Sequence, residues 1–213
     1  MIAYADDVAL IVRGKFLDTL MELMQGYLNL VINWTANCGL SINPLKTELV
    51  LFTRKYKVPR VLLPSISGAP LVLSDKVKYL GLILDRGLTW KPNIEERIRK
   101  TTVALYGCRG AIGKRWGLSP KVTFWLYNTI IKPILLYGVL VWWNSLERMV
   151  SVKKLERVQR SALIGISGAL RTTPTLALNA MLNVAPVDIV GKTTAARAAI
   201  RLRCSDHRLD GHS

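Results

Sequence analysis

Two adjacent carboxylates near the start of the sequence are the first residues that suggest chemistry. Asp6 and Asp7 end the run Tyr4-Ala5-Asp6-Asp7, which has small, apolar and β-branched neighbours on both sides. Such neighbours predict two short strands that form a buried hairpin with the acidic pair at its corner. Burial of two carboxylates costs free energy unless cations compensate, and divalent metals bridged by phosphate oxygens would do so. Asp6 and Asp7 are therefore candidate ligands for Mg²⁺ or Mn²⁺, and a pair of such ions could support an in-line phosphoryl displacement.

A solvated turn is the alternative reading of the same residues, because Asp-Asp is ordinary turn chemistry. Two further segments bear on the choice. Lys46 lies in a proline-containing turn and is the only basic residue between Lys15 and Arg54, so its ammonium could neutralise or protonate a departing pyrophosphate. The run Lys78-Tyr79-Leu80-Gly81 ends in a glycine that permits the close approach of another backbone or a ligand. Taken singly, Lys46 is better explained as a solvated turn lysine, and the glycine can be explained as a bulge or a packing accommodation.

Taken together, the order and spacing of the three segments resemble reverse transcriptases, most closely those of the Pol polyproteins of non-LTR (LINE-like) type-1 retrotransposable elements. The runs Arg171-Thr172-Thr173-Pro174-Thr175 and Ala177-Leu178-Asn179-Ala180 are similar as well, so the resemblance covers nearly the whole chain. It implies an RNA-directed DNA polymerase, a nucleotidyltransferase that adds dNTPs to a primer copied from RNA. The parent polyprotein would also carry an endonuclease, a hydrolytic nuclease activity for which these residues show no motif.

The resemblance assigns four roles: metal binding at the catalytic site, contact with the primer end or nucleotide, protonation of pyrophosphate, and the grip on the primer backbone. Asp6 and Asp7 would bind the metal, and Tyr4 would contact the primer end or nucleotide. Lys46 would protonate pyrophosphate, and the primer backbone would be held by Tyr79, Leu80 and Gly81. Such polymerases need another aspartate from an earlier palm strand, and only three residues precede Tyr4. We therefore expect a fragment of a polymerase that does not polymerise by itself.

The elements that position these residues change in kind close to residue 88. Before that point the pattern predicts the hairpin, a helix over Lys15–Cys38 that Gly39 stops, a strand over Thr47–Thr53, and a pair of strands over Leu71–Leu73 and Val77–Leu84. After it the pattern predicts helices, broken at Gly117, Pro120, Pro133, Gly168, Pro174 and Pro186. The apolar run Ile134–Trp143 predicts a buried helix and is too short to span a bilayer.

The expected fold class is therefore α+β, a partial polymerase palm followed by helices. In terms of the resemblance, residues 1–88 form the C-terminal part of the palm with the primer grip. Residues 89–168 form a helical thumb-like region, and residues 169–213 a C-terminal helical nucleic-acid-binding region.

Positive charge is concentrated after residue 50. The chain has 213 residues and a formal net charge of +16, of which residues 1–50 contribute −2 and residues 51–213 contribute +18. Half of the residues (50%) are apolar, which is enough for a core and argues against wholesale disorder. Basic residues at helical spacing should bind phosphates without regard to sequence. The candidates are Arg97 and Lys100 in one helix and Lys153, Lys154, Arg157 and Arg160 in another.

The partners implied by the resemblance are an RNA template, a DNA primer or target DNA, and dNTPs, in an intracellular protein that acts in the nucleus. Three widely spaced cysteines also indicate a reduced, intracellular chain. We expect five tryptophans on apolar helical faces to lie in the core rather than to stack on bases. They are Trp90, Trp116, Trp125, Trp142 and Trp143.

Two alternatives from other functional classes stay open. The chain could be a non-catalytic, basic nucleic-acid-binding remnant in which the acidic pair is only a turn. It could also be attracted to a membrane surface, but proline breaks interrupt its basic residues and leave no long amphipathic face. A metal role for Cys204, His207 and His212 is disfavoured, because a structural zinc site needs four ligands and the C-terminal tail offers three.

Overall fold

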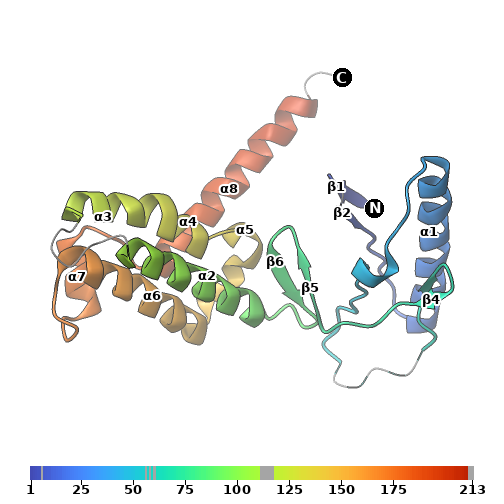
Figure 1. The fold of residues 1–213 in the computed structure, drawn as a ribbon, viewed down its shortest axis with the longest axis horizontal. Coiled ribbons are helices and arrows are strands. Elements are labelled where there is room, and N and C mark those ends of the chain that lie inside the picture. Colours follow the sequence, from blue (N-terminus) through green and yellow to red (C-terminus); the bar gives the residue numbers. More distant parts are fainter. Residues whose placement is uncertain (6, 56, 58, 60, 111–117, 211–213) are drawn as a thin grey trace. The chain divides into compact units, whose positions relative to one another are not determined.

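The computed structural model describes residues 1–5, 7–55, 57, 59, 61–110 and 118–210, without the side chains of 109–110 and 206–210. The chain divides into two units, Met1–Leu88 and Thr89–Ser213. The first unit combines short strands with one long helix, and the second is helical (Figure 1). The α+β mixture is therefore present as expected, while the palm and thumb assignments stay predictions.

Three two-stranded antiparallel hairpins make up the strands of the first unit. They are β1 (Ile2–Tyr4) with β2 (Asp7–Ala9), β3 (Ser65–Ile66) with β4 (Ala69–Pro70), and β5 (Lys76–Tyr79) with β6 (Leu82–Asp85). The β1–β2 hairpin is the one that the sequence predicts, whereas the β3–β4 hairpin was not predicted. No described strand joins two of these hairpins into a larger sheet.

The expected pairing of Leu71–Leu73 with Val77–Leu84 is wrong. The segment Val77–Leu84 folds back on itself as β5 and β6, because the two residues between these strands both have positive φ, 44° at Leu80 and 78° at Gly81. Positive φ at both central residues matches the twist of a two-residue hairpin. The glycine in this run therefore completes a tight turn and not a bulge within one strand.

The long helix α1 (Leu17–Asn37) is the helix expected over Lys15–Cys38. It ends just before Gly39, whose φ of 70° suits the residue that terminates a helix. The buried side chain of Leu28 belongs to a small core, completed by Leu49, Ile66 and Leu71. The side chain of Gln25 holds β3 against the helix: its Oε1 accepts from the Ser65 amide at 2.7 Å and its Nε2 donates to the Ser65 carbonyl at 3.1 Å.

The expected strand over Thr47–Thr53 does not form. Within it only Leu49 makes a bridge, parallel to Leu73, and its carbonyl accepts from the Ser74 amide at 2.8 Å. At the far end the Thr53 amide donates to the carbonyl of Arg86 at 3.1 Å. No described strand runs alongside in register between these two points, so a ladder of hydrogen bonds has no partner.

The second unit is a set of packed helices (Figure 1). They are α2 (Lys91–Gly110), α3 (Pro120–Leu126), the π-helical turn η2 (Tyr127–Ile131), α4 (Lys132–Leu135), α5 (Val139–Trp142), the 3-10 turn η3 (Trp143–Glu147), α6 (Met149–Ser167), α7 (Thr175–Met181) and α8 (Val187–Asp210). Buried side chains of α2, η2, α6 and α7 form the main core, among them Leu105, Tyr127, Leu163 and Leu178.

The break expected at Pro133 is wrong. The chain runs from α3 through η2 into α4 with helical backbone angles at each junction. Proline lacks an amide hydrogen and crowds the carbonyl four residues earlier, and the π turn directly before it is a known way to accommodate such a disturbance. The break falls instead at Gly138, whose φ is 63°, so the expected buried helix Ile134–Trp143 is divided between α4 and α5.

The tryptophans do not share one environment. Trp142 is fully buried, and its Nε1 donates to the carbonyl of Tyr137 at 3.0 Å, as a core position requires. Trp90 is half-buried, but Trp125 and Trp143 are 60% and 41% exposed, so the core prediction is wrong for these two. Trp116 lies outside the described residues.

Among the described helices, none is by itself long and apolar enough to cross a bilayer. The segments Pro120–Leu135 and Val139–Glu147 reach that length and composition only as a pair, bent by 52°.

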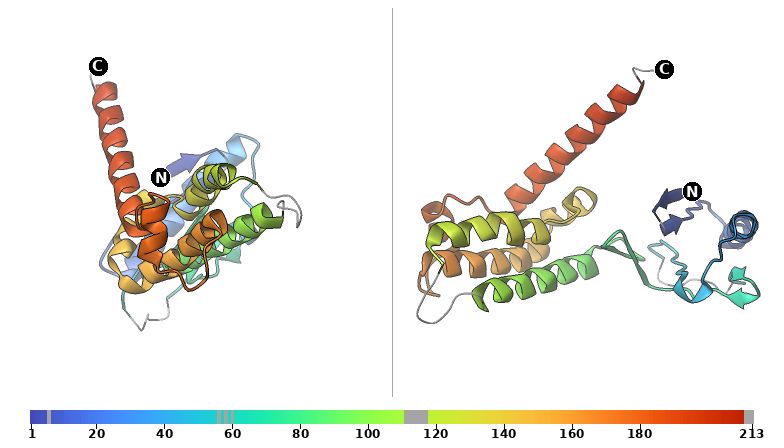
Figure 2. Two further views of the ribbon diagram at one scale, coloured as in Figure 1. Left: turned by 90° about the vertical axis from the view of Figure 1, so that its left-hand side faces the viewer. Right: turned by 45° about the horizontal axis from the view of Figure 1, so that its top comes forward.

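The helix α8 lies very close to its neighbours at Gly191. A Cβ added there would lie 2.5 Å from Cδ1 of Leu146, which is only 2% exposed, and 3.5 Å from Cδ2 of Leu136. Both side chains belong to the core and have little room to move. Farther along, α8 extends away from the other helices of this unit, and residues 200–205 are all exposed (Figure 2).

We expect Gly191→Leu to destabilise the second unit by about 1–3 kcal/mol, because the added side chain overpacks the core. Gly107→Leu in α2 is the matched control, since a Cβ at Gly107 meets nothing within 4 Å. That control should gain roughly 0.5–1 kcal/mol from better helix propensity. Urea unfolding followed by circular dichroism measures both. A Gly191→Leu midpoint equal to or above that of the unsubstituted chain would contradict the close contact.

A buried polar pair links η2 to α6. The side chain of Gln159, 1% exposed, donates from Nε2 to the hydroxyl of Tyr127 at 3.1 Å and to the carbonyl of Ala185 at 3.0 Å. Burial raises the pKa of Tyr127 above its usual value, and the bond from Gln159 opposes part of that rise. The phenol therefore ionises less readily in the folded protein than in the unfolded chain.

Because the pKa of Tyr127 is raised on folding, its contribution to stability is present below pH ~10 and is lost as the pH rises through the folded value. We expect Tyr127→Phe to cost about 1 kcal/mol at neutral pH and to weaken the alkaline loss of stability. Tyr106→Phe is the control, because Tyr106 is 64% exposed. Urea midpoints between pH 8 and roughly 11 test this. The same alkaline slope in both variants would show that Tyr127 does not cause it.

Candidate functional site

The β1–β2 hairpin places Tyr4 beside Asp7. The two residues are direct cross-strand partners, so their side chains project from the same face next to the two-residue tip Ala5-Asp6. Ala5 adopts a φ of 51°, the left-handed conformation that lets the chain reverse in two residues. Asp6, the first expected metal ligand, lies outside the described residues.

The prediction that this hairpin is buried is wrong. Tyr4 is 65% exposed, Ile2 54% and Val8 48%, and Asp7 is exposed as well. The apolar neighbours Ile2 and Val8 of the acidic pair therefore face solvent with about half of their surface, whereas Ala9 at the end of β2 is half-buried. Asp7 therefore carries no burial penalty, and the argument that cations must offset such a penalty loses its basis for this residue.

Lys46 stands on a well-ordered local turn. Asn43 caps the 3-10 turn η1 (Pro44–Lys46): its Oδ1 accepts from the Leu45 amide at 3.0 Å, and its carbonyl accepts from the Thr47 hydroxyl at 3.0 Å. Pro44 fixes the first residue of the turn. The Lys46 side chain is exposed, so its ammonium is free to meet an anion from solvent.

Tyr79, Leu80 and Gly81 form the tip of the β5–β6 hairpin. Tyr79 pairs with Leu82, and Leu80 and Gly81 are the two turn residues. Leu80 has a positive φ, a backbone conformation that costs free energy for a residue with a branched side chain. Its side chain is 40% exposed. The buried hydroxyl of Tyr79 has no hydrogen-bond partner among the described residues.

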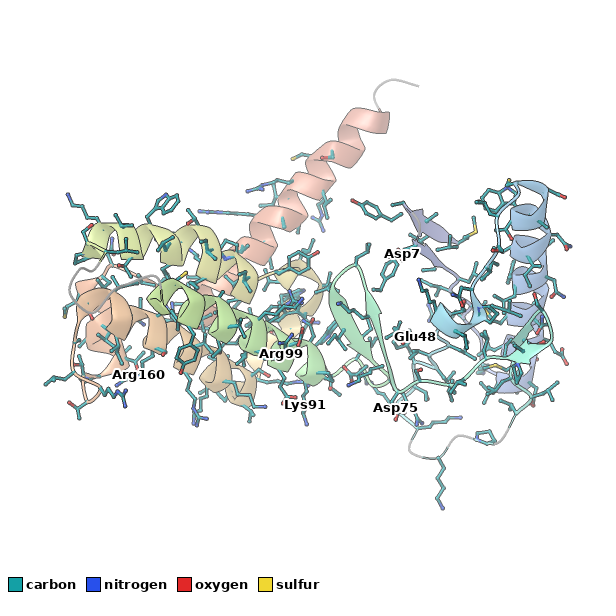
Figure 3. All side chains as sticks on the ribbon, viewed as in Figure 1. Asp7, Glu48, Asp75, Lys91, Arg99 and Arg160 are labelled. Carbon is teal, nitrogen blue, oxygen red and sulfur yellow. The ribbon has the colours of Figure 1, made fainter. Side chains whose placement is uncertain are left out.

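The described part of the chain does not assemble these residues into one site. Among the described residues, no ion pair is found between Asp7 and Lys46, and Tyr79 makes no hydrogen bond to either through its buried hydroxyl; Asp7 is labelled in Figure 3. Nor do the described side chains contain a group of three or more His, Cys, Asp or Glu able to hold a metal ion. Cys204 is exposed, while the imidazoles of His207 and His212 lie outside the described side chains.

In the second unit, Arg97 and Lys100 occupy different positions on α2. Arg97 is only 4% exposed and lies over the ring of Tyr137, with 5.0 Å between the guanidinium carbon and the ring centroid. A guanidinium in that position stabilises the packing of α2 and is not presented to solvent. Lys100 is half-buried and lies 3.8 Å from Glu96, which also binds Arg99 at 2.8 Å. The hydrogen bond from Arg99 lowers the pKa of Glu96 to about 2.

The four basic residues expected on α6 divide into two pairs. Lys153 and Arg157 are exposed, and the opposite face of the helix, which includes Leu155 and Leu163, is buried. Lys154 donates to Glu95 of α2 at 2.8 Å.

Arg160 (Figure 3) connects α6 to the loop before α7 and to Thr175, the first residue of that helix. Its Nη1 donates to the hydroxyl of Thr175 at 2.9 Å and its Nη2 to the carbonyl of Arg171 at 2.6 Å. The resemblance singled out this threonine-rich segment, and the structure uses it to receive a guanidinium from α6.

Arg86 is a positioning residue that the sequence did not indicate. Its Nη2 donates to the carbonyl of Lys55 at 2.6 Å, and its own carbonyl accepts from the Thr53 amide. The partners are separated by some thirty residues in the chain. Neither helical nor strand periodicity links such distant positions, so only an unusual local charge pattern around Lys55 could have drawn attention to them.

Comparison with known proteins gives one consistent answer. The chain is 27% identical over 198 residues to a retrovirus-related Pol polyprotein from a type-1 retrotransposable element R1 of Nasonia vitripennis, covering 88% of this chain and 51% of that protein. It is 25% identical over 200 residues to the probable RNA-directed DNA polymerase of transposon BS of Drosophila melanogaster (94% and 22%). It is 32% identical over 170 residues to the RNA-directed DNA polymerase of the mobile element jockey of the same fly (78% and 18%).

The chain spans between 18% and 51% of the length of these three relatives. No family model matches it, and no solved structure matches it significantly. The relatives do not favour the alternative of a non-catalytic remnant. The predicted resemblance is confirmed: the chain is homologous to a segment of the Pol polyproteins and RNA-directed DNA polymerases of R1- and jockey-type non-LTR retrotransposable elements.

Proposed function

We propose that this chain is the part of an RNA-directed DNA polymerase that carries the acidic turn of the active site and holds the primer–template duplex. The observation that carries the proposal is the register of the β1–β2 hairpin, which sets Tyr4 against Asp7 at the edge of a two-residue tip. The homologous relatives are named as RNA-directed DNA polymerases, and the similarity covers 78–94% of the chain. An acidic tip of this shape suits the addition of a nucleotide to a primer end.

The donor set of the hairpin fits a divalent cation in part. Mg²⁺ takes one or two carboxylates and completes its shell with water and substrate phosphates, and Asp7 with its sequence neighbour Asp6 offers that number. These carboxylates would hold Mg²⁺ or Mn²⁺, which neutralises charge that develops on the transferred phosphoryl group.

The other residues of the first unit have separate roles in this proposal. The Tyr4 ring, on the face of Asp7, would pack against the primer end or the incoming nucleotide. Lys46 would donate a proton to the departing pyrophosphate, for which its exposed position is suitable. The β5–β6 tip, Tyr79 to Gly81, would contact the primer backbone, because a tight turn brings main-chain amides close to a ligand.

The second unit would supply most of the affinity for nucleic acid. It holds twenty basic and seven acidic residues, a net charge of +13. Phosphate contacts of this kind release counterions and give sequence-independent, salt-sensitive binding. Lys153 and Arg157 are the phosphate-binding candidates on α6, since Lys154 and Arg160 are engaged within the unit. In the whole Pol protein we expect an accompanying endonuclease and action in the nucleus.

In a full-length Pol protein that contains this segment, Asp6→Asn and Asp7→Asn should each lower dNTP incorporation by at least 100-fold, because the carboxylate charge that binds the cation is lost. Duplex affinity should change less than twofold. Primer extension on RNA and filter binding measure the two quantities, and Asp75→Asn is the control carboxylate. Equal losses of synthesis and binding would refute the proposed division of labour. The isolated chain should not extend a primer.

For the isolated chain, Lys153→Gln with Arg157→Gln should weaken binding to an RNA–DNA hybrid and reduce the slope of log K against log salt by about 1–2. The control double variant, Lys91→Gln with Lys121→Gln, removes the same charge from exposed positions on α2 and α3. It should lose clearly less affinity. Fluorescence anisotropy between roughly 50 and 200 mM salt gives both slopes. Equal effects of the two double variants would mean that net charge, and not the α6 face, determines binding.

A further inference from the structure

The first unit contains a basic segment around Lys55, the residue whose carbonyl Arg86 binds. Between Glu48 and Asp75 the sequence contains four basic residues and no acidic one. Three of the four are described, Arg54, Lys55 and Lys57, and all three side chains are exposed. Exposed basic residues usually belong to a solvated loop whose backbone is unconstrained. Here, hydrogen bonds constrain the backbone of the segment.

Two hydrogen bonds join the start of the segment to Arg86, the residue after β6, and two others act within the segment and between Arg86 and Asp75. The Thr53 amide donates to the Arg86 carbonyl at 3.1 Å, and the Lys55 amide donates to the Thr53 hydroxyl at 3.2 Å. Arg86 in turn donates from Nη2 to the Lys55 carbonyl at 2.6 Å and from its amide to the Asp75 carbonyl at 2.8 Å. The backbone of Thr53–Lys55 is thus held in place while its charged side chains remain in solvent.

The neighbouring strand β5 adds charge to the same part of this unit. Lys76 and Lys78 are both exposed and, being two residues apart, project from one face of the hairpin. Asp85 is the cross-strand partner of Lys76, but Lys78 is opposite the apolar Ile83 and has no acidic partner across the strands. The turn residue Gly81 follows Lys78 by three positions in the sequence.

We propose that Arg54, Lys55, Lys57 and Lys78 form a phosphate-binding surface for the nucleic-acid strand that the β5–β6 tip contacts, with Arg86 as its positioning residue. The inference rests on the proposed function, because it extends the contact of the tip along the same strand. A polyanion with evenly repeated charges matches several exposed cations on an ordered backbone, whereas an isolated anion would need convergent donors. Arg86 keeps the segment beside the hairpin through its bond to the Lys55 carbonyl.

The first test compares two double variants of the isolated chain. Lys55→Gln with Lys57→Gln removes two exposed charges from the proposed surface, and Arg13→Gln with Lys15→Gln removes two exposed charges elsewhere in the same unit. With an RNA–DNA hybrid as the probe, the first variant should weaken binding about 10-fold or more at roughly 100 mM salt and reduce the salt slope by about 1–2. The second should stay within about threefold of the unsubstituted chain.

The second test separates position from charge. Arg86→Lys keeps the charge but removes the guanidinium that reaches the Lys55 carbonyl, so the affinity should fall while the net charge is unchanged. Circular dichroism must show the same helix content as the unsubstituted chain. The Lys55/Lys57 variant stays informative in any case, because both side chains are exposed and bear no fold contact.

The outcomes distinguish this inference from the proposed function. If the unsubstituted chain does not bind the hybrid at all, the proposed function fails first. If it binds, and the α6 variant weakens binding while the Lys55/Lys57 variant matches the Arg13/Lys15 control, only the present inference is overturned. Equal binding of acidic lipid vesicles and the hybrid, with equal loss in the Lys55/Lys57 variant, would also overturn it, because the surface would then attract any polyanion.

Discussion

The helical unit depends on the burial of one face of α6. Leu155, Ala162, Leu163 and Ile166 on that face are at most 5% exposed, and α6 packs against α2, α3, α7 and α8. Removal of this much apolar surface from water is the main favourable term that such a small unit has. The same packing decides which residues of α6 face outward. Lys153 and Arg157 are available to a ligand because the helix cannot rotate without exposing its leucines.

The strand-containing unit is organised by its turns, since its core is small. Its four core residues are Leu28, Leu49, Ile66 and Leu71, and its three hairpins share no ladder. An isolated two-stranded hairpin is marginal in water, so side-chain clamps such as Gln25 on β3 and Arg86 on Lys55 carry part of the task that a sheet would perform. The candidate site residues lie at the tips of these turns, where the backbone is exposed.

Local signals in the sequence predicted much of this structure. The acidic hairpin, the helix before Gly39, the α6 glycine stop at Gly168 and the α+β mixture follow from turn residues and periodicity, which act over a few positions. The failures have tertiary causes. A strand over Thr47–Thr53 needed a partner in register, and the described part of the unit contains none. Pro133 continues a helix because a π turn precedes it, and Arg97 points inward because Tyr137 offers it a ring.

For the candidate site, the sequence located the residues but not their environment. The order and spacing of the segments that contain Tyr4, Asp7, Lys46 and Tyr79 led to the resemblance to reverse transcriptases, with which the homologous relatives agree, while the roles of these residues stay proposals. Burial could not be inferred in the same way, because exposure of the hairpin depends on which other elements cover it. The roles of Arg86 and Arg160 were equally hidden, since each binds carbonyls distant in sequence.

The two halves of helix α8 differ in how they are held in the protein. Its first half is anchored where Val187, Gly191 and Ala195 are buried, whereas residues 200–205 touch no other helix closely enough to be shielded from water. Beyond the anchor, helicity rests on intrinsic propensity and on the alanines at positions 196, 198 and 199, and isolated helices of that length are marginal. The free energy of local unfolding should therefore fall steadily toward the C-terminal end of α8. The same helix would then contain some of the amides best protected from hydrogen exchange in this unit and some of the least protected.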